Sequence, residues 1–139
     1  MDYPSNGRQM SPSDRLDWLL ERFDGRCAWC GFELSRPGAR PTRDHVVPKI
    51  KGGPARLENE VPACASCNGL RGHEPPSRFI ERSRDERGLE PDAAGIASQL
   101  EALERAIGRE GGMRKIRDYV TRELRRVQAL AQEEPRQGR

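Results

Sequence analysis

The sequence predicts a small α+β protein, with a central domain of two strands and a helix between an N-terminal helix and a C-terminal helical hairpin. All 4 cysteines and both histidines of the 139-residue chain lie within residues 27–73. The segments on either side carry apolar residues at helical spacing instead. Only 34% of the residues are hydrophobic and 34% are charged, so the core is small. A core of this size needs further stabilisation, and a bound metal ion is the expected source.

The first helix is expected to follow residues 1–10, which are polar and expected to be flexible. The sequence SPSD at residues 11–14 is similar to a capping box with proline at the first helical position. Asp24 and Gly25 are residues that stop a helix. The apolar residues between them lie on one helical face and are Leu16, Leu19, Leu20 and Phe23.

The cysteines form two pairs with the spacing of a zinc site. The pairs are Cys27-x-x-Cys30 and Cys64-x-x-Cys67, and four thiolates can surround one Zn2+ tetrahedrally. Two disulfides are the alternative use of these residues. The N-terminal sequence lacks the features of a signal peptide, and no run of about 18 apolar residues could span a membrane. We therefore expect a cytoplasmic location, of the bacterial or phage intracellular kind, where such pairs favour metal.

Two strands and a helix are predicted between and after the cysteine pairs. Residues 43–47 are typical of a short strand, residues 51–54 of a turn and residues 57–62 of a second strand. From residue 65 onward the chain can begin a helix. The predicted order is therefore strand, strand, helix, with the second cysteine pair at the start of the helix.

Polar residues suited to metal-dependent hydrolysis lie in the same stretch. The sequences DHVVPKIKGG and LENEVPACASCNGLRG, together with the cysteine pairs, resemble an HNH endonuclease of the ββα-metal class with a structural zinc. This resemblance covers residues 27 to about 73 and rests on several features in a fixed order. It implies a nuclease domain over residues 11–90, with residues 27–73 as its core.

The resemblance and the chemistry of the side chains imply a role for each polar residue. His45 is the expected general base, because an imidazole with a pKa of about 6.5 accepts a proton at neutral pH. Asp44 and Asn68 supply oxygen ligands suited to Mg2+ or Mn2+, with Asn68 standing where the family name implies a histidine. By resemblance, Asn59 braces the loop before the helix and orients His45. Arg71 can reach a phosphate of the substrate.

Each of these residues also has a plainer structural interpretation. Asn68 can simply start a helix, Asn59 can cap a turn, and Arg71 can be a solvated surface arginine. Neighbouring side chains on a regular strand point to opposite faces. Asp44 and His45 can therefore serve one site only if the strand is twisted or ends there.

The C-terminal part is expected to form an antiparallel helical hairpin over residues 91–132, after a helix over residues 77–88. Residues 108–112 are the predicted glycine-rich link, and residues 133–139 a flexible tail. The two apolar stripes consist of Ile96, Leu100, Leu103 and Ile107, and of Met113, Ile116, Val120, Leu124, Val127 and Leu130. These stripes can cover each other, pack on the nuclease domain, or join two chains as a homodimer.

The sequence thus predicts a metal-dependent endonuclease that nicks or cleaves DNA, with a structural zinc and a catalytic Mg2+ or Mn2+. The alternative is a non-catalytic zinc-ribbon-like module that binds nucleic acid or protein, which has no need of Asp44, His45 and Asn68. A net charge of +3 is weak support for a nucleic-acid partner. The charged face of the last helix can follow a DNA backbone or simply be solvated; its basic residues are Arg114, Lys115, Arg117, Arg122, Arg125 and Arg126.

Overall fold

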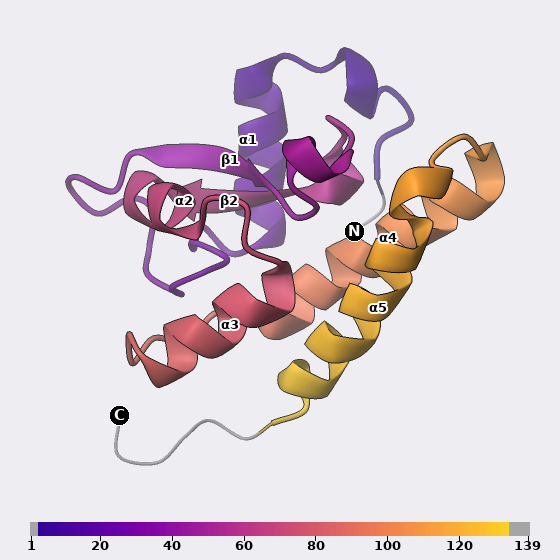
Figure 1. Cartoon of the computed structure of the whole chain (residues 1–139). Coiled ribbons are helices and arrows are strands. Elements are labelled where there is room, and N and C mark those ends of the chain that lie inside the picture. Colours follow the sequence, from indigo (N-terminus) through magenta and orange to yellow (C-terminus); the bar gives the residue numbers. More distant parts are fainter. Residues whose placement is uncertain (1–2, 134–139) are drawn as a thin grey trace.

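Two antiparallel strands and one helix form the centre of the fold in the computed structural model, which describes residues 3–133 (Figure 1). Strand β1 (Pro41–His45) pairs with strand β2 (Glu60–Cys64), and helix α2 (Ala65–Arg71) follows β2 directly. Helix α2 packs against both strands. The predicted order of strand, strand and helix is therefore confirmed.

Both strands are shifted relative to the predicted ones. Strand β1 ends at His45, two residues before the expected end at Val47, and β2 begins only at Glu60. The residues before β2, Leu57–Asn59, form a short 3-10 helix, η3. The shift has a side-chain cause, because the backbone N–H of Val47 donates to Oδ1 of Asn59 at 2.8 Å instead of pairing with β2.

The described residues form four further α-helices: α1 (Pro12–Arg22), α3 (Pro76–Asp85), α4 (Ala93–Glu110) and α5 (Arg114–Ala131). Two more 3-10 helices, η1 (Gly7–Gln9) and η2 (Lys49–Lys51), lie in the connections. In Figure 1, α4 and α5 lie side by side and antiparallel, and α3 lies beside α5. The fold is thus α+β with an N-terminal helix and a C-terminal hairpin, as predicted.

Helix α1 begins at the predicted cap. The side chain of Ser11 accepts a hydrogen bond from the backbone N–H of Asp14 at 3.1 Å, and Pro12 is the first helical residue. In the segment before it, the Tyr3 ring packs against Trp18 at a centroid distance of 4.9 Å. Residues 1–2, also expected to be flexible, lie outside the described part of the chain.

The C-terminal hairpin is covered within its own chain. Every residue of the two predicted stripes is buried except Met113, which is partly buried. Helix α4 continues to Glu110, so the link between the helices is shorter than the predicted residues 108–112. The expected tail lies outside the described residues apart from Glu133. No helix within residues 3–133 is long and apolar enough to cross a membrane.

The hairpin shares one core with the strands and α2. Gln99 of α4 is fully buried, and its Nε2 donates to the carbonyl oxygens of Leu57 and Glu60 at 2.8 and 2.6 Å. Arg56 forms two hydrogen bonds with the carboxylate of Glu110, at 3.0 and 2.8 Å. No break in the buried cluster marks the expected domain boundary near residue 90.

Replacing Leu100 by alanine is expected to lower the free energy of unfolding by about 2–5 kcal/mol, because the side chain is 0% exposed where α4 meets the rest of the core. Leu70→Ala is the matched control, since Leu70 is 49% exposed. Urea unfolding of the zinc-loaded chains measures both. Equal losses of stability in the two variants would contradict a shared core.

Candidate active site

The four cysteines come together near the edge of the sheet where β1 begins and β2 ends. Their Sγ atoms all lie within 4.8 Å of one another, and all four residues are buried and free of disulfides. The backbone N–H of Gly31 donates to the carbonyl oxygen of Cys27 at 2.9 Å, which closes a tight turn around the first pair. The backbone N–H of Cys67 donates to Sγ of Cys64 at 3.4 Å. Four sulfurs arranged in this way suggest a structural zinc site.

The donor chemistry of the cluster fits a cation. Hydrogen bonding with Cys30 raises the pKa of Cys27, whereas hydrogen bonding with Cys27 lowers the pKa of Cys30. Thiols this close share protons and do not all ionise, unless a cation takes the place of those protons. Arg87 donates to Sγ of Cys67 at 3.3 Å and offsets part of the charge of about −2 that four thiolates and one Zn2+ carry.

Cys64→Ser is expected to lose zinc and most of its ordered structure, because a structural zinc site contributes directly to folding. Zinc content per chain and far-UV circular dichroism measure the two effects. Ser66→Ala is the control, since Ser66 is exposed in the same turn of helix α2. A folded, zinc-containing Cys64→Ser protein would show that the cluster is not the zinc site.

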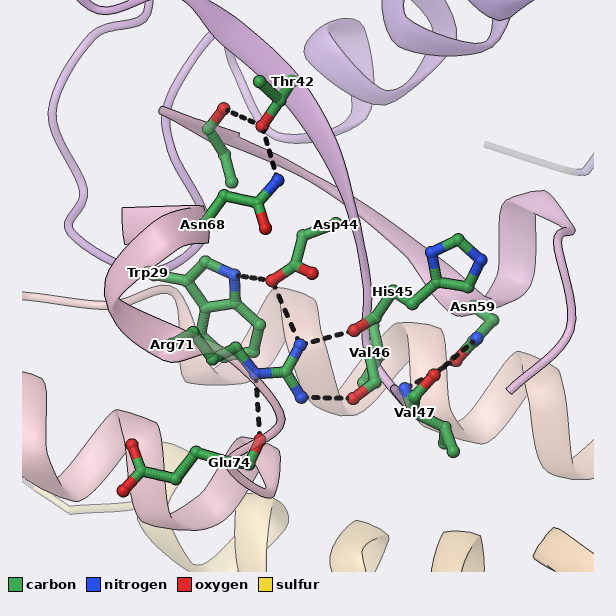
Figure 2. A network of polar contacts seen from close by, with 11 residues as sticks. Trp29, Thr42, Asp44, His45, Val46, Val47, Asn59, Asn68, Arg71 and Glu74 are labelled. Atoms are coloured by element: carbon green, nitrogen blue, oxygen red, sulfur yellow. Dashed lines mark hydrogen bonds and ion pairs between the residues drawn. The ribbon is translucent and has the colours of Figure 1, made fainter. Parts of the chain in front are cut away.

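One carboxylate oxygen of Asp44 is fixed by two residues from elsewhere in the chain (Figure 2). Trp29 Nε1 donates to Oδ2 of Asp44 at 2.9 Å, and Arg71 Nη1 donates to the same oxygen at 3.0 Å. The Asp44 side chain is 11% exposed, and within residues 3–133 no donor reaches its second oxygen, Oδ1. Asp44 therefore has a fixed orientation and one carboxylate oxygen left for a ligand.

Asn68 lies on the same side of β1 as Asp44. Thr42 and Asp44 are two residues apart on the strand, so their side chains share the face that α2 covers. Asn68 of α2 donates through Nδ2 to Oγ1 of Thr42 at 3.0 Å. Figure 2 shows the Asn68 amide next to the Asp44 carboxylate. The structure thus brings these two oxygen-bearing side chains together between β1 and α2.

Asn59 holds the loop that follows β1. It is 0% exposed, and its Oδ1 accepts from the backbone N–H of Val47 at 2.8 Å. Its Nδ2 donates to the carbonyl oxygens of Val47 and Pro54 at 3.1 and 3.0 Å. The carbonyl oxygen of Asn59 also accepts from the N–H of Val46 at 2.7 Å. These bonds fix the backbone directly after His45.

His45 leaves the end of β1 on the side opposite Asp44, toward the loop that Asn59 holds (Figure 2). Its partner across the strands is Glu60, which is 0% exposed and ion-paired with Arg15 and Arg43 at 3.1 and 2.9 Å. No hydrogen bond joins the His45 ring to any residue in the described part of the chain. The side chains of Asp44 and His45 therefore lie on either side of one strand end and not in contact.

Burial is the main influence on the charge of His45. It lowers the pKa of the imidazole from its ordinary value, and the nearby positive charges of Arg43 and Lys49 act in the same direction. The carboxylates of Glu60 and Asp44 raise the pKa, but they do not outweigh burial. His45 is therefore neutral at pH 7 and able to accept a proton.

Arg71 lies in a different environment from the expected one. Its side chain is 0% exposed and stacks on Trp29, with the guanidinium carbon 4.6 Å from the ring centroid. It donates to the carbonyl oxygens of His45 and Val46, the latter at 2.6 Å. Its Nε donates to the carbonyl oxygen of Glu74 at 3.0 Å. The expected phosphate contact does not fit this position, because the donors of Arg71 are used inside the protein.

Two residues of this network were not among the expected site residues. Trp29 lies between the first two cysteines, and Thr42 lies two residues before Asp44. The strand period gives a signal for Thr42, since residues two apart share a face. No local pattern points to Trp29, because its bond to Asp44 depends on how the cysteine turn packs against β1.

Residues 27–83 match the sequence model of the HNH endonuclease family. The HNH domain begins at the first cysteine of the cluster and ends within α3, and it contains every candidate site residue. No curated protein matches the chain at a significant level. The match suggests that residues 27–83 form a nuclease domain.

The flanking helices lie outside the matched segment but contact buried polar groups of the HNH domain. Arg15 of α1 pairs with Glu60, and Gln99 of α4 donates to the carbonyl oxygen of the same residue. Glu123 of α5 accepts from the backbone N–H and the hydroxyl of Ser77 at 2.8 and 3.0 Å. The helices therefore support β2 and the start of α3.

The imidazole of His45 is expected to titrate below its ordinary pKa of about 6.5, because burial disfavours the charged form. A lowered pKa means that the neutral form persists to a lower pH than in an exposed histidine. NMR titration of the zinc-loaded protein without added magnesium measures this value, with His45→Ala used to assign the resonance. A pKa at or above 6.5 would contradict the environment described for this residue.

Proposed function

We propose that this protein is a metal-dependent endonuclease that hydrolyses phosphodiester bonds of DNA. The observation that carries the proposal is the geometry of Asp44. One of its oxygens is fixed by Trp29 and Arg71, and the other has no donor among residues 3–133, on the side of β1 where Asn68 lies. A zinc module that only binds a partner has no use for a carboxylate held in this way.

The oxygen donors of Asp44 and Asn68 fit a divalent ion such as Mg2+ or Mn2+. Such an ion supplies positive charge for the non-bridging and leaving oxygens of the phosphodiester when it is bound. Two protein ligands leave positions for water and phosphate. This site is separate from the cysteine cluster, where four sulfurs complete the coordination of zinc.

His45 is the proposed general base. Its neutral imidazole takes a proton from the water that attacks phosphorus, a step that typically contributes about 10²–10⁴-fold to a rate. The scissile phosphate has to lie across the end of β1, since His45 and Asp44 leave that end on opposite sides. The early end of the strand at His45 supports this arrangement.

Asn59 and Arg71 are proposed to position these groups. Asn59 fixes the loop after His45 through Val47 and Pro54. Arg71 donates both to the Asp44 carboxylate and to the backbone carbonyl oxygen of His45, so one guanidinium ties the Asp44 side chain to the backbone that carries His45. Neither residue needs to contact the ion for this role. One site per chain favours nicking of one strand at a time.

His45→Ala is expected to lower the rate of supercoiled-plasmid nicking in Mg2+ or Mn2+ by about 100-fold or more, because the proton acceptor is lost. Asp44→Asn is expected to weaken activation by the metal, measured as the Mg2+ concentration that gives half-maximal nicking. His73→Ala is the control, since the other histidine of the chain is exposed.

Zinc content is matched in all variants before the rates are compared. Nicking by His45→Ala at the wild-type rate would remove His45 as the base. A zinc-loaded wild-type chain that nicks nothing in either metal would favour a non-catalytic nucleic-acid or protein binding module.

A further inference from the structure

An exposed isoleucine stands between two lysines directly after the candidate site. Ile50 is 69% exposed, more than any other large hydrophobic side chain in the described part of the chain. Lys49 and Lys51 on either side are also exposed, and neither forms an ion pair with a described residue. Only three of the 25 basic residues are lysines, and two of them lie here.

The turn that carries Ile50 is rigid. The 3-10 helix η2 is closed by hydrogen bonds from Lys51 N to Pro48 O and from Gly52 N to Lys49 O, both at 2.9 Å. Gly52 has a φ of +97°, a backbone conformation that side chains other than glycine rarely adopt. An exposed apolar side chain on a fixed turn loses little entropy when it is buried by a partner.

Close packing also fixes the turn against the rest of the loop. A Cβ atom on Gly53 would lie 1.8 Å from the carbonyl oxygen of Val47, so only glycine fits there. Asn59 bonds to Val47 and to Pro54, on both sides of the turn. Since the N–H of Val46 also bonds to Asn59, Ile50 is held in a fixed place relative to the end of β1 and His45.

A second basic segment lies beside the turn. A Cβ atom on Gly52 would lie 3.2 Å from Cγ2 of Ile116, which places the turn against the first residues of α5. Arg114 and Lys115 in those residues are exposed. The isoleucine is therefore surrounded by positive charge on its own turn and beside a helix that adds more. This combination of an apolar side chain and positive charge complements DNA, whose anionic phosphates surround a stack of apolar base faces. An acidic protein surface offers the negative charge but no such stack for the isoleucine to enter.

We propose that Ile50 is a wedge that enters the minor groove of double-stranded DNA next to the cleaved phosphodiester, with Lys49 and Lys51 on the phosphates of the two flanking strands. The minor groove is only about 6 Å wide and admits a narrow turn, and apolar wedges between base steps are a known means of bending DNA. This inference rests on the proposed nuclease function. The wedge unstacks one base step and thereby bends the backbone toward His45.

The test uses the full-length, zinc-loaded chain carrying His45→Ala, so that the DNA stays intact. Its binding to a short duplex labelled with 2-aminopurine is followed by anisotropy and by the rise in 2-aminopurine fluorescence on unstacking. Ile50→Ser is expected to weaken binding about tenfold and to lose the fluorescence rise, because an apolar contact is removed. Ile50→Met keeps an apolar side chain and is expected to retain both signals.

The lysines have a separate signature. Lys49→Gln and Lys51→Gln are each expected to reduce the slope of log K against log salt by about 1, because each lysine releases counterions on binding a phosphate. Ile50→Ser is expected to leave that slope unchanged. Phe32→Ser is the matched control, since Phe32 is 50% exposed on the cysteine turn, and it is expected to behave like the parent.

Unchanged binding and fluorescence in Ile50→Ser, or an equal loss in Phe32→Ser, would overturn the wedge. Failure of the parent chain to bind duplex DNA at low salt would overturn it as well. Plasmid nicking by the chain with native His45 tests the nuclease function separately. If the chain nicks DNA but its binding and the fluorescence rise do not depend on Ile50, the nuclease function stands and the wedge is wrong. If the chain unstacks DNA through Ile50 but never nicks it, the wedge stands and the nuclease function is wrong.

Discussion

Four cysteine sulfur atoms, two from before β1 and two from the end of β2 and the start of α2, converge on one point. The rest of this domain depends on that convergence. Cys27 and Cys30 precede β1, whereas Cys64 ends β2 and Cys67 lies in α2. Joining them fixes where α2 starts relative to β1. It also presses the turn between the first two cysteines against the strand, where Trp29 meets Asp44. A short sheet of two strands has too little apolar area to fix these positions alone.

The two faces of β1 are organised by different side chains. On one face, Arg71 and Trp29 hold the Asp44 carboxylate, and on the other, Asn59 holds the backbone that follows His45. Both sets of bonds are formed by residues of the chain itself. Groups held in place before the reaction need no reorganisation during it, which is the physical advantage of a preorganised site. The same Asn59 bonds also make the neighbouring turn rigid.

Buried charges link this site to the flanking helices. Glu60 lies opposite His45 with no exposed surface, and two arginines neutralise it, one of them from α1. Removing one partner of such a group leaves a buried charge without compensation, which typically costs about 3–5 kcal/mol. Gln99 adds a further bond from α4 to the Glu60 backbone. The helices outside the HNH domain therefore help to fix the strand that pairs with the site.

Local pattern in the sequence determined several features of this protein. The spacing of the cysteines predicted their cluster, the SPSD cap predicted the start of α1, and the apolar stripes predicted the C-terminal hairpin. Each of these depends on residues near one another in the chain or on a regular period. Asp44 and His45 were likewise visible as neighbours within the first predicted strand, and the short resemblance to HNH endonucleases suggested the family.

Only the tertiary structure decided which groups those residues meet. Arg71 was expected at a phosphate, but it is buried, and its donors reach the carbonyl oxygens of His45 and Val46, more than 20 residues earlier in the chain. The bond that fixes the backbone just after β1 joins Val47 to Asn59, 12 residues apart. Hydrogen bonds across such separations have no period in the sequence. Local sequence and the family resemblance therefore singled out the candidate site residues, and packing determined their orientation.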